Sequence, residues 1–244
     1  MNLPMHPIMQ QSFAVIDQEV GDHNFSAAEY AIVRRVIHST ADFDFQQLLR
    51  FSPGAIATAI AALQQRCPII TDVGMVKQGV ANMVAQTFGN PLISAVEQVS
   101  EALPGKTRTE TGLLKCLQQF PQAIVVIGNA PTALLALCQE MQAQQMQAQQ
   151  MQHSNSLVLA PALVIGAPVG FISVVESKAA LAVTPVPQIR VEGRKGGSPV
   201  AAAILNALLV LAWEQQSEAP VLDSIAAMLE TNGDRPLPTQ PRNR

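Results

Sequence analysis

The sequence is poor in charged and in aromatic residues. Only 14% of its 244 residues are Asp, Glu, Lys or Arg, and only 4% are Phe, Trp or Tyr. The formal net charge of −3 argues against general binding to nucleic acid through a basic surface. Because 48% of the residues are hydrophobic and few of them are aromatic, the core must be built from Ala, Val, Ile and Leu. This composition favours an α/β protein, with a mostly parallel sheet flanked by helices.

Cysteine is scarce as well. Cys67, Cys116 and Cys138 are odd in number and widely spaced. We therefore interpret them as free, mostly buried thiols in a reducing compartment, rather than as disulfides or a metal site. No apolar run reaches the roughly 18 residues of a membrane span. No basic segment followed by an apolar stretch opens the chain. These observations predict a cytoplasmic protein with no membrane partner.

Helix starts can be predicted from short capping patterns. Ser26–Glu29 and Thr107–Glu110 both have Ser or Thr followed three residues later by Glu, which is the capping box. Ser52-Pro53 predicts a further start, with Ser as the N-cap and Pro as the first helical residue. Short apolar runs predict five strands within residues 68–71, 92–96, 122–127, 162–165 and 186–191.

The predicted strands are followed by glycine-rich or polar turns and then by helices. Strands joined in this way run parallel, with right-handed crossovers. Their turns therefore lie at one edge of the sheet, where open α/β sheets bind ligands. We expect one pocket formed by the turns around Asp72, Arg108, Asn129, Pro168 and Arg194. None of these turns reads G-x-G-x-x-G or G-x-x-x-x-G-K-[ST], which argues against a Rossmann-type oxidoreductase and a P-loop nucleotide site.

The last of these turns has the strongest anion-binding character. A short β-type run leads into Gly193-Arg194-Lys195-Gly196-Gly197-Ser198, and Pro199 then opens a small-residue helical pattern. Glycines free the backbone N–H groups, and Ser198 is a good N-cap. Two cations and a helix N-terminus then lie together, which suits an anion. The alternative is a tight strand-to-helix turn with solvated charges.

Arg108 and His38 are two further candidates. Arg108 lies in the first turn of a predicted helix, where its charge opposes the helix dipole unless an anion is near. The alternative is a solvated arginine. His38 lies near the end of the helix that begins at Ser26, where the dipole favours the imidazolium while Arg34 and Arg35 oppose it. A histidine balanced in this way can carry a proton near neutral pH. The alternative is a histidine that caps the last carbonyls.

Two segments have the character of additions. Residues 139–152 repeat MQAQQ and place Met141, Met146 and Met151 five residues apart. Five residues turn an α-helix by about 140°, so these Met side chains cannot share one stripe. We interpret the segment as a helix extension or a solvated insert. Residues 221–229 are predicted to form one more short helix, and the Pro- and Arg-rich residues 231–244 are expected to be disordered.

An ordered set of motifs between about residues 6 and 212 resembles the precorrin-8X methylmutase family, also called precorrin isomerases, of corrin biosynthesis. Each motif is weak alone, and their order makes the set specific. They are His6-Pro7-Ile8 with Ser12-Phe13-Ala14, Val36-Ile37-His38, Thr71-Asp72-Val73-Gly74-Met75-Val76, Thr107-Arg108-Thr109, Gly128-Asn129-Ala130-Pro131-Thr132-Ala133-Leu134, Gly166-Ala167-Pro168-Val169-Gly170-Phe171 with Glu176-Ser177-Lys178, and Gly193-Arg194-Lys195-Gly196-Gly197-Ser198.

The resemblance implies one α/β domain over residues 1–213, with the Gln-rich insert at about 139–156 and a C-terminal extension at 214–244. Two positions depart from the family pattern. Gln11 stands where the family often has Arg, which weakens the assignment of Ser12 as a substrate contact. The run Ser39-Thr40-Ala41 is more polar than expected after the histidine.

The resemblance also implies a homodimer with the substrate site near the subunit interface. The implied reaction moves a methyl group between adjacent carbons of a tetrapyrrole-derived macrocycle, giving hydrogenobyrinate from precorrin-8X or cobyrinate from cobalt-precorrin-8. The family's catalytic histidine falls on His38. The expected substrate-binding residues are Ser12, Asp72, Met75, Thr107, Arg108, Asn129, Thr132, Lys178, Arg194, Lys195 and Ser198.

These residue types suit that chemistry. The substrate is a flat apolar ring with an anionic rim, and arginine can hold a carboxylate by two hydrogen bonds. A concerted methyl shift needs no nucleophile, resident cofactor or catalytic metal, and we expect none. His38 is predicted to donate a proton to a ring nitrogen as a general acid. A non-catalytic corrinoid carrier is the alternative function.

Overall fold

A six-stranded sheet forms the centre of the fold. The computed structural model describes residues 6–150 and 160–232. The strand order is β1-β6-β5-β4-β2-β3. β1 pairs antiparallel with β6, and the other neighbours are parallel. The strands are β1 (Leu49–Phe51), β2 (Ile69–Thr71), β3 (Leu92–Ser94), β4 (Ile124–Ile127), β5 (Leu163–Gly166) and β6 (Gln188–Val191).

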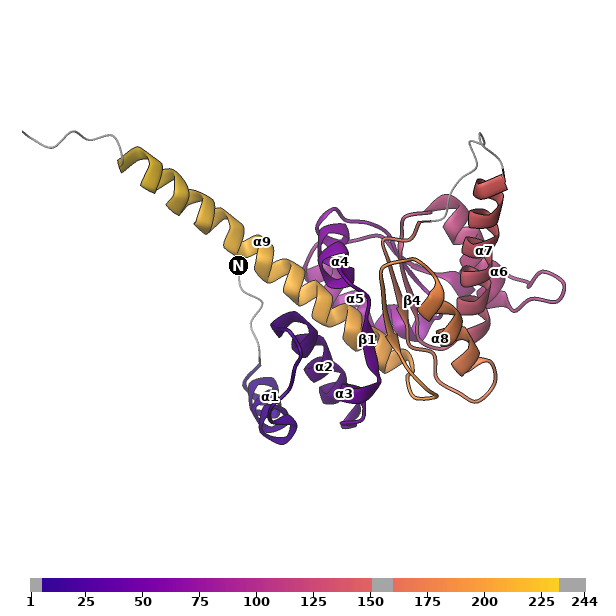
Figure 1. Cartoon of the computed structure of the whole chain (residues 1–244), viewed down its shortest axis with the longest axis horizontal. Helices are drawn as coiled ribbons and strands as arrows, with labels where there is room; N and C mark the ends of the chain where they lie inside the picture. Colours follow the sequence, from indigo (N-terminus) through magenta and orange to yellow (C-terminus); the bar gives the residue numbers. More distant parts are fainter. Residues whose placement is uncertain (1–5, 151–159, 233–244) are drawn as a thin grey trace, which may run out of the picture.

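Helices cover both faces of this sheet (Figure 1). One face carries α2, α4, α5 and α9, with α1 packed on α2, and the other carries α6, α7 and α8. The helices are α1 (Pro7–Val20), α2 (Ala27–Thr40), α3 (Phe45–Leu48), α4 (Ala55–Gln64), α5 (Gly74–Gln86), α6 (Arg108–Gln119), α7 (Pro131–Gln150), α8 (Val174–Val183) and α9 (Ser198–Asn232), with a 3-10 turn η1 at Ala95–Glu97.

Successive residues of the central strands serve two separate cores. In β4, Ile124 and Val126 pack toward α9, whereas Val125 and Ile127 pack toward α6 and α7. All four are fully buried. A strand that is buried on both faces needs a continuous apolar run, which is why the run at 122–127 predicts this strand. The mostly parallel α/β fold is confirmed.

The central helix of the larger core is α9, which packs on α2, α4 and α5. Its first part, Ser198–Gln216, is long and apolar enough to cross a membrane by length and composition alone. This corrects the expectation that no such run exists. Ile204, Leu205, Leu208 and Leu209 are fully buried there. Packing on three neighbours accounts for the apolar composition, because a core helix is hydrophobic on most sides.

Both capping boxes are confirmed, but the third helix start is wrong. α4 begins at Ala55, and its N-cap is Gly54 in the left-handed region with φ 75°. Ser52 instead pairs with the end of β6, because its N–H donates to the Gln188 carbonyl and its Oγ accepts from the Gln188 N–H. The antiparallel strand β1 just before it was not predicted. A contact between residues so far apart in sequence leaves no local pattern.

The Gln-rich segment continues α7 as far as Gln150. Met141 is 5% exposed and Met146 is 63% exposed, so they do not share an apolar stripe, as predicted. Met151 lies outside the described residues. α9 runs without a break through 221–229, so the separate short helix predicted there is wrong. The disorder expected for 231–244 falls mainly on residues 233–244, which lie outside the described part of the chain.

Candidate functional site

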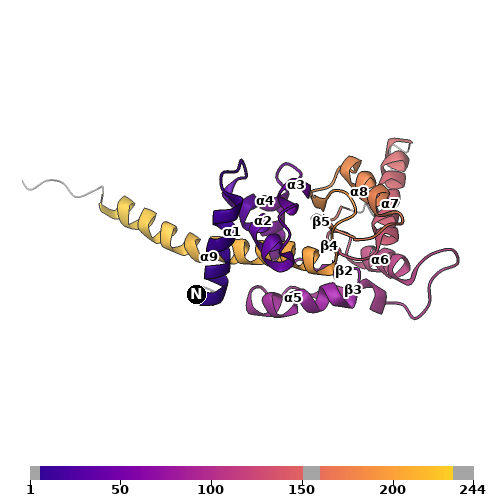
Figure 2. The same cartoon turned by 90° about the horizontal axis from the view of Figure 1, so that it is seen from below.

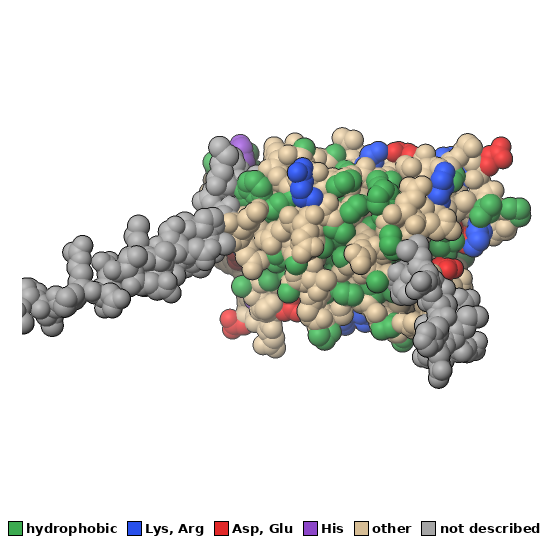
Figure 3. All heavy atoms as spheres, turned by 90° about the horizontal axis from the view of Figure 1, so that it is seen from above, with side chains coloured by type: hydrophobic (Ala, Val, Ile, Leu, Met, Phe, Trp, Pro, Cys, Tyr) green, Lys and Arg blue, Asp and Glu red, His purple; other side chains and the backbone are tan. Residues whose placement is uncertain are grey.

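The turns that follow the five parallel strands lie at one edge of the sheet, the carboxyl edge (Figure 2). They are the turns after β2, β3, β4, β5 and β6, and the prediction that they gather is confirmed. Neighbouring strands lie about 4.8 Å apart, so β3 and β6, four spacings apart, give the edge a length of roughly 19 Å. The side of the molecule seen from above has charged side chains of both signs spread among apolar and neutral ones (Figure 3). Because of its length of roughly 19 Å, the carboxyl edge can accommodate a large, flat ligand.

Asp72 joins the turns after β2 and β4. Its Oδ2 accepts hydrogen bonds from the N–H groups of Gly128, Asn129 and Ala130 at 3.1, 2.6 and 2.8 Å. Its Oδ1 accepts from the N–H of Val73 at 2.9 Å. Burial raises the pKa of the Asp72 carboxyl, and these hydrogen bonds oppose that rise. Asp72 is 0% exposed and its side chain builds the turn, so burial disfavours the substrate contact, which stays a prediction.

Lys178 has a similar role in the turn after β6. It projects from α8, and its Nζ donates to the carbonyls of Gly193 and Lys195 at 2.8 and 2.7 Å. The residue is only 3% exposed, and burial lowers the pKa of its amine to about 8. Two of the N–H donors of the amine are thus used by the turn itself. The amine points inward and fixes the turn, so burial disfavours the predicted substrate contact of Lys178, which stays a prediction.

The turns after β5 and β6 are also joined through their backbones. The Gly197 N–H donates to the Ala167 carbonyl at 2.8 Å, and the Gly170 N–H donates to the Arg194 carbonyl at 3.3 Å. Gly196 has φ 153°, and a Cβ there would clash with the carbonyl oxygen of Ala167. The glycines therefore serve close packing of two turns. The Arg194 side chain is exposed, with its guanidinium 5.7 Å from the ring centre of Phe171.

Thr107, Arg108 and Thr132 meet at the other end of the edge. The hydroxyls of Thr107 and Thr132 are 3.1 Å apart. Arg108 is exposed at the start of α6, and its Nη2 donates to the Val96 carbonyl at 3.0 Å. The hydrogen bond to the Val96 carbonyl stabilises the Arg108 cation at the helix N-terminus, so its position there does not require an anion. The remaining guanidinium donors of Arg108 are available to a ligand.

Lys195 is neutralised by two carboxylates. Its Nζ is 2.6 Å from both Asp42 Oδ2 and Asp44 Oδ2. These hydrogen bonds hold the pKa of the amine above its ordinary value. Asp42 lies just after α2, so the pair brings the end of that helix to the carboxyl edge. Asp42 and Asp44 were not predicted for the site, because they lie 153 and 151 residues from Lys195 and no local signal connects them.

His38 lies in the last turn of α2, four residues before Asp42. It is exposed, and its ring packs edge-on against Phe13 of α1 with ring centres 5.3 Å apart. Partial burial lowers its pKa, and the positive charge of Arg35 lowers it further. No hydrogen bond to either ring nitrogen is found within the described residues, so both nitrogens can meet a ligand.

The carbonyls at the end of α2 are capped without His38. The hydroxyls of Ser39 and Thr40 each donate to the Val36 carbonyl at 2.9 Å, and the Ala41 N–H donates to the Ile37 carbonyl at 2.7 Å. The alternative in which His38 caps these carbonyls is therefore wrong. The polar run that departs from the family pattern has a local structural use.

The other predicted site residues differ in their exposure. Asn129 and Met75 are exposed at the carboxyl edge, at the turn after β4 and in the first turn of α5. Ser198 is 7% exposed at the start of α9, in close contact with Gly128. Ser12 lies on α1, where its Oγ donates to the Ile8 carbonyl at 2.9 Å. These four substrate contacts stay predictions, and burial makes Ser198 the weakest of them.

Comparison with known proteins now adds to this geometry. The family model described as precorrin-8X methylmutase matches residues 7–211. The chain belongs to the precorrin-8X methylmutase family. It is similar to the cobalt-precorrin-8 methylmutase of Synechocystis, with 55% identity over 86% of this chain and 97% of the relative. It is also 37% identical to the precorrin-8X methylmutase of Pseudomonas aeruginosa, over 82% and 93% of the two chains.

A solved precorrin-8X methylmutase has the same fold. The crystal structure from Thermus thermophilus superimposes with a TM-score of 0.73 and 38% identity, covering 86% of this chain and 99% of that chain. Like its precorrin-8X methylmutase relatives, this protein is an isomerase. No group of three or more His, Cys, Asp or Glu side chains within residues 6–150 and 160–232 could hold a metal ion.

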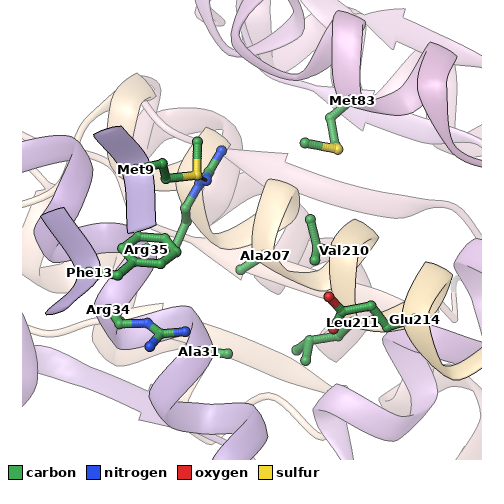
Figure 4. Close-up of a pocket in the computed structure, with 10 residues that line it drawn as sticks. All are labelled: Met9, Phe13, Ala31, Arg34, Arg35, Met83, Ala207, Val210, Leu211 and Glu214. Atoms are coloured by element: carbon green, nitrogen blue, oxygen red, sulfur yellow. Dashed lines mark hydrogen bonds between the residues drawn. The ribbon is translucent and has the colours of Figure 1, made fainter. Parts of the chain in front are cut away.

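A small hollow lies beside α2 in this precorrin-8X methylmutase family member (Figure 4). Its volume is about 170 Å³, and Phe13, Arg34 and Arg35 line it opposite Met83 of α5. Arg34 is paired with Asp17 at 3.0 Å, whereas the Nη1 of Arg35 contacts the sulfur of Met9 at 3.1 Å. Small-molecule pockets usually enclose about 300–1,000 Å³. The hollow is therefore too small to enclose a whole macrocycle, and the candidate site stays the carboxyl edge, where the exposed side chains of the motifs gather.

Proposed function

We propose that this chain catalyses the methyl shift that converts cobalt-precorrin-8 into cobyrinate, with the cobalt belonging to the substrate. The 55% identity to the Synechocystis cobalt-precorrin-8 methylmutase supports the cobalt-containing substrate. The observation that carries the proposal is the Lys195–Asp42 pair. This pair brings the end of α2, with His38, to the same edge as Arg194 and the glycine turns.

Substrate binding is assigned to the exposed side chains of this edge. The guanidinium of Arg194 forms no ion pair with any described residue, so it can bind a rim carboxylate through two hydrogen bonds. Arg108 offers its remaining donors at the other end of the edge. The Thr107–Thr132 hydroxyls lie beside Arg108 and add neutral donors, and Asn129, after the central strand β4, lies between the two arginines. This spacing suits a ligand with several separated carboxylates.

His38 is assigned the general acid, with a proton going from its imidazolium to a ring nitrogen of the macrocycle. The methyl group then moves between adjacent carbons in a concerted step, and the product returns the proton to the imidazole. The net reaction is an isomerisation, so no resident cofactor is needed. Proton donation of this kind contributes roughly 10²- to 10⁴-fold in rate. Only the protonated histidine can act, and its lowered pKa makes that form scarce at neutral pH. A substrate carboxylate near Arg35 would offset the repulsion and raise the pKa of His38.

A homodimer in the cytoplasm is the proposed form of the enzyme. The hollow beside α2 is too small for the substrate. Arg108, Asn129 and Arg194 at the carboxyl edge are exposed to solvent in the single chain. A second copy laid over this edge would exclude water from the reacting ring. Confinement of this kind holds a reactive conformer and accounts for rate beyond the proton transfer.

The decisive experiment measures turnover of cobalt-precorrin-8 and of metal-free precorrin-8X by the change in visible absorbance. We expect turnover of both, with the higher kcat/KM for the cobalt form. The His38→Ala variant, shown to be folded by circular dichroism, should lose roughly 10²- to 10⁴-fold in kcat. A folded His38→Ala variant with near-normal turnover would remove His38 from the mechanism. Tight binding by the wild type without turnover of either substrate would contradict the enzymatic proposal.

The pH dependence sharpens the same test. Because the acid must be protonated, kcat/KM should fall as pH rises through the pKa of His38 in the free enzyme, which burial and Arg35 lower. Arg35→Met removes the charge repulsion and should move the midpoint upward. A midpoint unaffected by Arg35→Met would argue that another group donates the proton.

A further inference from the structure

The turn after β5 exposes large apolar side chains at the carboxyl edge. Phe171 is 83% exposed and Ile172 is 82% exposed. Val169 and Val175, on either side of them in sequence, are each 46% exposed. We call these four residues the apolar tip. Scattered exposed hydrophobics are ordinary, but a contiguous group at a candidate site indicates a surface that something covers.

The backbone holds the apolar tip outward. Ser173 has φ 58°, a left-handed conformation that is uncommon for a residue with a side chain, and it makes no side-chain cap to α8. Strain of this kind is maintained only where the surroundings enforce it. Ser173 is flanked by two fixed points, the Gly170–Arg194 hydrogen bond before it and the buried Val174, which is 1% exposed, after it. The exposure of Phe171 and Ile172 is therefore a built feature of the turn.

A cation lies at the margin of the apolar tip. The guanidinium of Arg194 is 5.7 Å from the ring centre of Phe171, within reach of a cation–π contact. An apolar surface bordered by a cation with free hydrogen-bond donors matches a ligand that has an apolar face and a carboxylate at its rim. The macrocycle assigned under the proposed function has both features.

We propose that the apolar tip is the surface on which the flat face of the macrocycle lies, with Phe171 as the main contact while Arg194 binds a rim carboxylate beside it. The inference rests on the proposed function and adds the residues that select a planar, apolar ligand. Phe171 covers the ring by stacking, and Ile172 and Val169 extend the contact. Preference for the intact macrocycle over smaller carboxylates follows, because only a ring large enough to cover the tip gains this contact.

The test is a titration of the full chain with cobyrinate, followed by the visible absorbance of the corrinoid. Phe171→Ala should raise Kd roughly 10- to 100-fold, as expected for losing the burial of one Phe side chain. Phe171→Leu should recover part of the affinity. Val183→Ala is the matched control, because Val183 is 75% exposed at the other end of α8, and its Kd should equal that of the wild type.

The outcomes separate this inference from the proposed function. Normal turnover by the wild type together with an unchanged Kd in Phe171→Ala would overturn the inference alone. Dissociation of a dimer by Phe171→Ala in analytical ultracentrifugation, with unchanged cobyrinate affinity, would assign the apolar tip to a second copy and also overturn it. If the wild type neither binds cobyrinate nor turns over cobalt-precorrin-8, the proposed function fails, and the inference fails with it.

Discussion

The turn after β2 and the turn after β5 lie at the same edge of the sheet but expose opposite kinds of group. In the first, the charged side chain of Asp72 is fully buried and accepts four backbone hydrogen bonds. In the second, the hydrophobic side chains of Phe171 and Ile172 are more than 80% exposed. The turn after β2 thus buries a carboxylate, and the turn after β5 exposes hydrophobic side chains. Both arrangements invert the ordinary preference of these residue types.

The comparison separates a frame from a contact surface. Asp72 and Lys178 are buried, have backbone partners and fix the conformation of the turns. Arg194 and the apolar tip are exposed and held outward by that frame. A charged residue that is buried in a site motif can therefore act on the substrate only through the backbone that it positions. Substitutions in the frame should cost stability, whereas substitutions in the contact surface should cost affinity.

The largest expected effect on stability comes from Asp72→Ala. It removes the acceptor of four buried or partly buried N–H groups, so the free energy of unfolding should fall by about 2–4 kcal/mol. Asp72→Asn keeps the size of the side chain but replaces an acceptor oxygen by a donor. Its free energy of unfolding should fall nearly as far as that of Asp72→Ala. Urea denaturation measures both. Asp22→Ala, an exposed control, should be neutral. An Asp72→Ala variant as stable as the wild type would show that Asp72 does not fix the conformation of these turns.

A smaller, pH-dependent effect is expected from Lys178. Its pKa is lowered from 10.5 to about 8 in the folded chain. Between these values the unfolded chain binds the extra proton, so the free energy of unfolding should rise with pH, by at most about 1.4 kcal/mol per pH unit. Lys178→Met should remove this rise in urea denaturation between pH 8 and 10.

Lys115→Met is the matched control for Lys178. The Lys115 amine also donates to a carbonyl, that of Gln98 at 3.0 Å, but the residue is exposed. Its replacement should leave the pH dependence unchanged. A wild type whose stability is flat over this range would show that the Lys178 amine stays protonated in the folded chain.

Much of the fold can be predicted from local sequence. The capping boxes at Ser26 and Thr107 mark helix starts because their hydrogen bonds are made within four residues. The strand β4 can be predicted because both of its faces are buried. The edge strand β1 and the Ser52 contact cannot, since their partners lie in β6, far along the chain. Local sequence patterns fail to predict an element when its hydrogen bonds are made with residues far along the chain.

The candidate site also has features that can be predicted from sequence and features that cannot. The gathering of turns at one edge follows from the parallel sheet alone, and the role of His38 is implied by family resemblance. The direction in which a side chain points is a different matter. Asp72, Lys178 and Lys195 are charged residues in site motifs, yet each has partners that only the folded chain brings near. Sequence patterns identify the turn, and packing decides whether its charge faces inward.

Separate values of cobyrinate Kd and single-turnover rate for Arg194→Ala and His38→Ala test the central claim most directly. We predict that Arg194→Ala raises Kd by roughly tenfold or more and leaves the rate of the bound step nearly unchanged. Lys195→Ala should raise Kd less, because Asp42 and Asp44 already neutralise that amine. His38→Ala should leave Kd unchanged and slow the bound step by roughly 10²- to 10⁴-fold. A His38→Ala variant with the wild-type single-turnover rate, or an Arg194→Ala variant with the wild-type Kd, would contradict the account.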